Sequence, residues 1–182
     1  MRVTSERRLA RRLSSCFTLL FLAACLTCGV SCGGNAEALL AYQSRALSLT
    51  IAYERGGVSY EAAVTLAAGG EGRDATLTYL APESLAGMTY ARTGGEITVT
   101  RGSITSAASG DALLPLSLFA IPVEAKVTGI ERTEGGRVAT LLAGNAVYTL
   151  AFADGQEIPV SLSRAEDGAE YLALTVKEAL SQ

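Results

Sequence analysis

Histidine is absent from the sequence, and its absence excludes several kinds of active site. A Ser-His-Asp or Cys-His arrangement needs an imidazole, and so does a histidine metal site. Paired carboxylates remain an acid–base option, because the chain has 18 Asp and Glu residues. They fall on the polar side of expected strands or in turns, where a solvated carboxylate has little reason to change its pKa. We therefore expect no enzyme activity, no catalytic residue, no metal and no cofactor.

Cysteine is confined to the first 32 residues. No disulfide can therefore support the rest of the chain, which must be held together by a hydrophobic core. Cys25 and Cys28 have the spacing of a redox or zinc pair, but no second cysteine pair and no histidine could complete a zinc site. We interpret the pair as part of an N-terminal signal region.

Positive charge is scarce after the N-terminal region. The whole chain has a formal net charge of -3, but five of its 15 basic residues and one of its 18 acidic residues precede Cys25. The remainder carries ten basic and seventeen acidic residues, a net charge of -7. Such a surface is repelled by phosphates, so we expect no nucleic-acid partner, and any membrane attachment must depend on acyl chains.

An export signal opens the chain. Four arginines between positions 7 and 12 precede an apolar run over residues 16–24, which is too short for a permanent transmembrane helix. The run ends in Leu22-Ala23-Ala24-Cys25, which resembles the lipobox of bacterial lipoproteins. That resemblance implies a signal peptide over residues 1–24, an acylated Cys25 and a flexible tether over residues 25–35. The mature protein would then be lipid-anchored on the extracytoplasmic face of the cell membrane.

Two alternatives to acylation at Cys25 remain open. Cys32 is followed by Gly33 and Gly34 and could be the acylated residue, although Gly29 is a poor match to the leucine expected three positions before it. The other alternative is an ordinary secretory signal that is cleaved without acylation.

Period-two alternation dominates residues 47–176 and predicts a mostly β fold. Apolar residues at 47, 49, 51 and 53 alternate with smaller or polar ones, and glycine-rich turns at 56–57 and 69–72 join this strand to two more. Further strands are predicted over residues 88–92, 96–101, 125–133, 137–143, 145–153, 157–163 and 171–176. Pro159 suggests that its strand lies at an edge or carries a bulge. Tight turns imply antiparallel neighbours, since parallel strands need long crossovers.

Helices are expected only as short pieces. Residues 36–45 predict a helix that leads into the fold, and residues 177–182 predict a helical tail. Residues 81–87 form a turn, and residues 106–110 a loop of small residues. Asp111 is then a candidate helix cap before an apolar stretch that ends at Ile121 and must be covered. Residues 70–75 fit a dinucleotide-binding pattern, but a β-type segment follows them, which indicates a hairpin turn.

The predicted architecture is α+β but mostly β, over residues 36–182: a single curled antiparallel sheet or half-barrel, with short helices on its concave side. The lipobox, the short helix, the meander and the segment Tyr79-Leu80-Ala81-Pro82-Glu83-Ser84-Leu85-Ala86-Gly87-Met88 before a Gly-Gly hairpin together resemble the LolA/LolB-type lipoprotein carrier superfamily. They are most similar to its uncharacterised lipoproteins from Gram-positive spore formers.

The resemblance implies a concave apolar face that holds a lipid or another hydrophobic ligand. The residues expected to line it are Tyr53, Tyr79, Met88, Ile97, Leu116, Phe119, Tyr148 and Phe152. An alternating apolar face is also what a plain packed core looks like. The alternative function is therefore a packed lipoprotein that docks an envelope partner, such as a cell-wall enzyme, through a sheet edge.

Acylation can be tested by labelling with radioactive palmitate. Cys25→Ser should abolish incorporation because the acylated thiol is lost, whereas Cys32→Ser should leave it intact. The reverse pattern would assign the anchor to Cys32, and incorporation that survives both substitutions would contradict the lipoprotein interpretation.

Overall fold

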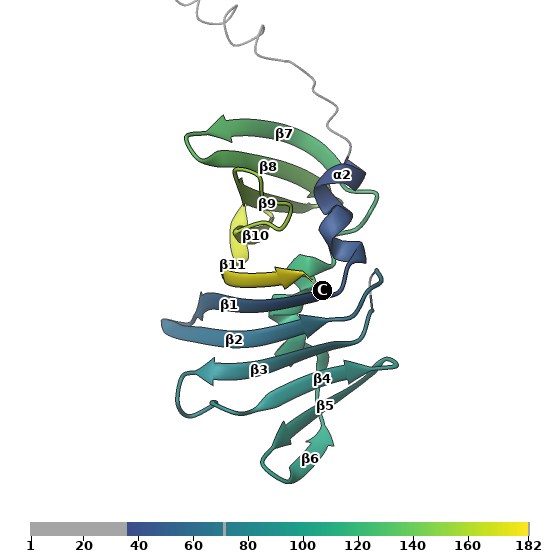
Figure 1. Ribbon diagram of the computed structural model, residues 1–182, viewed down its shortest axis with the longest axis vertical. Coiled ribbons are helices and arrows are strands. Elements are labelled where there is room, and N and C mark those ends of the chain that lie inside the picture. The colour runs from purple at the N-terminus through teal and green to yellow at the C-terminus, as the bar shows by residue number, and fades with distance from the viewer. Residues whose placement is uncertain (1–35, 71, 182) are drawn as a thin grey trace, which may run out of the picture. The chain divides into compact units, whose positions relative to one another are not determined.

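The period-two stretches form an eleven-stranded antiparallel sheet in the computed structural model, which describes residues 36–70 and 72–181 (Figure 1). The expected signal, Cys25 and Cys32 lie outside the described residues, and Gly33–Gln182 forms one compact unit. The strands are β1 (Leu47–Arg55), β2 (Val58–Leu66), β3 (Ala75–Ala81), β4 (Thr89–Thr93), β5 (Glu96–Arg101), β6 (Ile104–Ala107), β7 (Lys126–Thr133), β8 (Gly136–Ala143), β9 (Ala146–Ala153), β10 (Ser161–Glu166) and β11 (Ala169–Ser181).

The strand order is β6-β5-β4-β3-β2-β1-β11-β10-β9-β8-β7. Each half is a meander of sequence neighbours, and the halves meet where β1 pairs with β11 (Figure 1). That seam aligns Ile51 with Val176 and Tyr53 with Leu174, after a register shift between Thr50 and Ile51. β6 and β7 are the two free edges of the sheet, so the predicted open, curled antiparallel architecture is confirmed.

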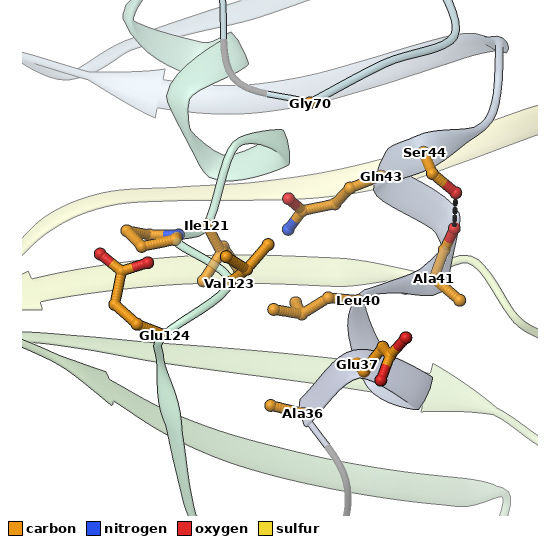
Figure 2. A pocket seen from close by; sticks show the side chains of 11 residues that line it. Ala36, Glu37, Leu40, Ala41, Gln43, Ser44, Gly70, Ile121, Val123 and Glu124 are labelled. Carbon is orange, nitrogen blue, oxygen red and sulfur yellow. Dashed lines mark hydrogen bonds between the residues drawn. The ribbon is translucent and has the colours of Figure 1, made fainter.

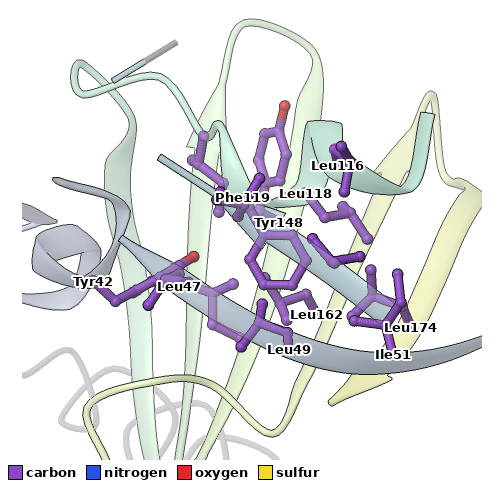
Figure 3. Close-up of a cluster of buried hydrophobic side chains, with 14 of the residues drawn as sticks. Tyr42, Leu47, Leu49, Ile51, Leu116, Leu118, Phe119, Tyr148, Leu162 and Leu174 are labelled. Carbon is purple, nitrogen blue, oxygen red and sulfur yellow. The ribbon is translucent and has the colours of Figure 1, made fainter. Parts of the chain in front are cut away.

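The core lies on the inner face of this curled sheet. Leu47, Leu49, Ile51 and Tyr53 are buried along β1, while the residues between them are only half-buried, as the alternation predicted. Leu116, Leu118 and Phe119 come from a 3-10 helix, η2 (Gly110–Phe119), and pack with them against Leu162 and Leu174 (Figure 3). Because η2 connects the two opposite edges, the chain must cross the inner face there, which explains why this stretch is so apolar.

The predicted N-terminal helix is present as two consecutive pieces, α2 (Ala36–Leu40) and the 3-10 helix η1 (Ala41–Ser44). The predicted cap of the second helix was wrong, because η2 begins at Gly110 and Ser109 is its N-cap, with no side-chain hydrogen bond. Pro115 lies inside η2 and has no N–H to donate, which favours a short, irregular helix over a long α-helix.

The predicted helical tail over residues 177–182 was wrong. β11 continues to Ser181, and Leu49 pairs with Ala179. The local preference of Lys-Glu-Ala-Leu for a helix is weak, whereas the backbone of β1 would lose its hydrogen-bond partners on this side if the tail left the sheet. Tertiary pairing therefore overrides the local preference.

Two other predicted boundaries also moved. Residues 104–107 form β6, which the sequence did not indicate, and the following loop is correspondingly shorter. β10 begins at Ser161 rather than at residue 157. It lies inside the sheet, so the predicted edge position was wrong, but its pairing with β11 does carry the alternative irregularity, a register shift between Arg164 and Ala165. Pro159 precedes it with a fully buried ring, and the adjacent Val160 still bonds to Ala151 and Val176 at 2.8 Å.

Gly136 is the position in the sheet where a side chain fits least. It is buried at the start of β8, and a Cβ there would overlap the carbonyl oxygen of Phe152 on β9. We expect Gly136→Ala to lower the free energy of unfolding by about 3 kcal/mol, because either strand must shift to relieve the overlap. Urea denaturation would measure the loss.

Gly135→Ala is the matched control, because a Cβ on this neighbour meets open space. It should unfold at the same urea concentration as the parent protein, or slightly higher. Equal destabilisation by both substitutions would contradict the close packing of β8 against β9.

Candidate functional site

Two of the predicted ligand residues meet in a row of tyrosines that crosses four strands. This tyrosine row consists of Tyr53, Tyr60, Tyr79 and Tyr90, from β1, β2, β3 and β4. The Tyr53 and Tyr60 rings stack at 4.9 Å, and Tyr60 to Tyr79 and Tyr79 to Tyr90 follow at 6.0 and 6.1 Å. The Tyr53 and Tyr79 hydroxyls share a buried 2.9 Å hydrogen bond.

Two members of the tyrosine row, Tyr53 and Tyr79, have shifted pKa values. Burial raises the pKa of both Tyr53 and Tyr79, and their shared hydrogen bond raises that of Tyr53 further while lowering that of Tyr79. Both phenols therefore stay protonated. The hollow beside them, which Leu85 and Leu114 also line, measures only about 160 Å³.

The other six predicted residues do not converge on one cavity. Met88 and Ile97 are half-buried and pack against the core, while Leu116 and Phe119 of η2 are 4% and 1% exposed. Tyr148 and Phe152 lie buried on β9, and Figure 3 shows Tyr148 within the packed cluster. The structure thus places these residues in the interior, and their contact with a ligand stays a prediction.

A larger hollow than the one beside the tyrosine row lies between the N-terminal helix and the segment that follows η2. This α2 cavity has a volume of about 750 Å³ (Figure 2). Its lining residues are Ala36, Glu37, Leu40, Ala41, Gln43, Ser44, Gly70, Ile121, Pro122, Val123 and Glu124. Small side chains on α2 and η1 leave the space open. Ile121, only 2% exposed, forms part of the inner wall, whereas Val123 is 87% exposed at the rim.

Gln43 supplies the unusual polar group of the α2 cavity. Its side chain points toward Ile121 and Val123 (Figure 2), the residue is only 9% exposed, and Nε2 has no hydrogen-bond partner among the described residues. The neighbouring Tyr42 hydroxyl is likewise buried and unpartnered there. Burial raises the pKa of Tyr42, and the nearby Gln43 amide and Arg73 oppose that effect only in part. Buried polar groups are normally paired, so Gln43 Nε2 marks the place in the α2 cavity where a hydrogen-bond acceptor would be stabilised.

Arg73 holds the walls of the α2 cavity together. Its Nη1 donates to the carbonyl oxygens of Gln43 in η1, of Arg45 at 2.9 Å and of Ala67 at 3.2 Å, and Nη2 donates to Phe119 at the end of η2 at 3.4 Å. The residue is buried, and burial lowers its pKa. One cation therefore fixes three segments that are far apart in the sequence.

Sequence reasoning missed both Arg73 and the α2 cavity. The hairpin turn predicted over residues 70–75 is confirmed, but an arginine in a glycine-rich turn is normally a solvated residue. The only available signal was a single cation among small residues. Gln43 was part of a predicted helix, and nothing in its surroundings distinguished it from a surface amide.

A second hollow adjoins the α2 cavity and is more polar. This polar hollow, of about 470 Å³, shares Pro122 and Glu124 with the α2 cavity and adds Lys126, Asn145 and Arg164 among its lining residues. Arg164 forms an ion pair with Glu166 and lies 5.7 Å from the centre of the Tyr148 ring.

Neither a metal site nor a membrane span is apparent in the part of the chain that the structure describes. Residues 36–70 and 72–181 contain no group of three or more Cys, Asp or Glu side chains placed to hold a metal ion. Within the same residues, no helix has the length and hydrophobicity needed to cross a bilayer.

No protein-family model matches the sequence, and no curated protein matches it. Among solved structures, the chain is similar to an uncharacterized conserved protein from Thermus thermophilus (18% identity, TM-score 0.51, 81% of this chain and 83% of that one). It is also similar to MucB (15%, TM-score 0.51, 84% of this chain), of which it spans only 60%. A LolA superfamily protein from Nitrosomonas europaea is a further neighbour (10%, TM-score 0.46, 81% and 94%). At these identities the likeness concerns the fold alone.

Removing the Arg73 cation should loosen the α2 cavity and the fold together. Arg73→Met keeps most of the side-chain length but leaves several buried carbonyl oxygens without a donor, so we expect a loss of about 3 kcal/mol in the free energy of unfolding. Chemical denaturation measures it. Arg132→Met is the control, because Arg132 is exposed on β7. Equal stability of the two variants would contradict the role given to Arg73.

Proposed function

We propose that this protein is an exported, non-enzymatic binding protein that takes a lipid or another hydrophobic ligand into the α2 cavity. The observation that carries the proposal is a hollow of about 750 Å³ with a mainly apolar lining and a buried amide nitrogen, Gln43 Nε2, that has no hydrogen-bond partner among the described residues. Its volume falls in the range of about 300–1,000 Å³ that is typical of small-molecule pockets. An apolar lining with a few polar groups is also the usual composition of such sites.

In this proposal, the interior residues predicted from the sequence lie behind the inner wall of the α2 cavity. Ile121 lies two positions after Phe119, so the inner wall of the α2 cavity leads directly into the packed cluster of Figure 3. A ligand chain that displaces Ile121 or Leu40 would reach Phe119 first. The interior set therefore contacts the ligand only where the chain extends beyond the α2 cavity.

The N-terminal anchor would keep the α2 cavity close to the membrane. Ala36 begins α2 and lines the cavity, and it follows Cys25 by only eleven residues. Even fully extended, such a tether spans at most about 40 Å. An acylated Cys25 would thus place the α2 cavity within reach of lipids at the bilayer surface.

Docking of a partner protein through β6 is the second candidate, and a specific feature of this edge favours it. β6 carries no charged residue, and Ile104 is 73% exposed. Because the Ala108 N–H bonds to Ile97, the antiparallel alternation turns the backbone N–H and C=O of Thr105 and Ala107 outward. The opposite edge, β7, has a register shift and charged residues that discourage strand addition.

Native mass spectrometry of residues 33–182, followed by lipid extraction, tests the proposal. We expect a stoichiometric co-purified lipid. Ala41→Trp should reduce its occupancy at least tenfold, because an indole on this exposed lining residue fills the α2 cavity without disturbing the core. Ala86→Trp, in the exposed turn after β3, is the matched control and should keep the lipid.

A bare protein mass, with no later uptake of a fluorescent fatty acid or monoacylglycerol, would overturn the proposal. Crosslinking in the native envelope would then test the β6 edge as the functional surface.

A further inference from the structure

We propose that the α2 cavity selects ligands with an uncharged, hydrogen-bond-accepting polar end, such as an acyl ester or acyl amide, over anionic amphiphiles. This inference rests on the proposed function and names the class of ligand for the same site. Two independent features carry it: the donor inside the α2 cavity and the charges around it.

The donor is Nε2 of Gln43. It is buried, directed into the α2 cavity (Figure 2), and without a partner among the described residues. A carbonyl oxygen placed beside it would satisfy an otherwise costly buried N–H. Pure hydrocarbon offers no such acceptor, so the ligand that fits best carries an ester or amide carbonyl at the end of its apolar chain.

The charges around the α2 cavity are negative. Glu37 on α2 and Glu124 on the facing segment line opposite walls (Figure 2), and no cationic residue is among the lining residues. Glu124 is exposed and takes part in no ion pair within the described residues. A carboxylate or phosphate head would therefore meet like charge on entering.

The nearest cations are directed elsewhere. Arg73 donates to the backbone carbonyl oxygen of Gln43, and both of its terminal nitrogens are bonded to backbone carbonyl oxygens. Arg45 is paired with Glu157. Lys126 lines the polar hollow beyond Glu124 rather than the α2 cavity. Among the residues that the structure describes, no cation is thus free to reach an anionic head inside the α2 cavity.

A displacement assay separates the two classes of ligand. The uncharged fluorophore N-phenyl-1-naphthylamine is bound to residues 33–182 at pH 8 and displaced with monopalmitoylglycerol or with palmitate, which have the same chain. We expect monopalmitoylglycerol to act at about tenfold lower concentration, a factor that one well-made hydrogen bond or one charge repulsion supplies.

Variants assign the two features separately. Gln43→Leu should raise the concentration of monopalmitoylglycerol needed for displacement about tenfold and leave that of palmitate nearly unchanged, because only the hydrogen bond from Gln43 to the ester carbonyl is lost. Gln43→Met repeats the test if the leucine variant folds poorly. Glu124→Gln should lower the concentration of palmitate needed for displacement severalfold, whereas Glu83→Gln, in an exposed turn, should change the displacement by neither ligand.

The outcomes distinguish this inference from the function on which it rests. Equal displacement by the two ligands would overturn the selectivity and leave hydrophobic binding intact. A preference for palmitate that is lost in Lys126→Gln would place the anionic head in the polar hollow. That result would also overturn the proposed selectivity for uncharged ligands. Failure of the fluorophore and of both ligands to bind would overturn the proposed function itself.

Discussion

The pairing of β1 with β11 is the constraint on which the rest of the structure depends. Without it the chain would be two separate meanders, each with one apolar face and an additional open edge. The pairing joins the first strand to the last and makes one continuous inner face. It also places β6 and β7 at opposite edges, so the connection between them has to cross that face. The apolar residues of η2 follow from this route, because a polar side chain buried against that face loses its hydration.

Arg73 provides the second constraint, and it acts where the hydrophobic core ends. The N-terminal helix, the turn between β2 and β3 and the end of η2 come together at one side of the sheet. Their backbone carbonyl oxygens converge there, and one buried guanidinium satisfies several of them at once. The walls of the α2 cavity are the same segments. One buried cation thus ties together segments that line the α2 cavity.

The packed interior and the α2 cavity are two separate regions of the fold. Leu116, Phe119 and Phe152 fill the inside of the curl with apolar contacts and stabilise the fold. The α2 cavity lies beside this interior, where small side chains on α2 and η1 leave space. The buried amide nitrogen of Gln43 is a polar group in its wall. The packed interior therefore provides stability, and under the proposed function the neighbouring α2 cavity provides recognition. On that proposal, substitutions in the α2 cavity change ligand preference without disturbing the core.

Local chemistry in the sequence was enough to predict the sheet, because side-chain direction alternates along a strand whatever the rest of the chain does. The buried face of β1, the glycine turns and the need to cover the stretch ending at Ile121 all followed from neighbours in sequence. Tertiary structure alone decided that residues 177–181 pair as a strand, that Arg73 is buried and that Gln43 faces the α2 cavity. Each of these depends on backbone groups many residues away, which no local pattern records.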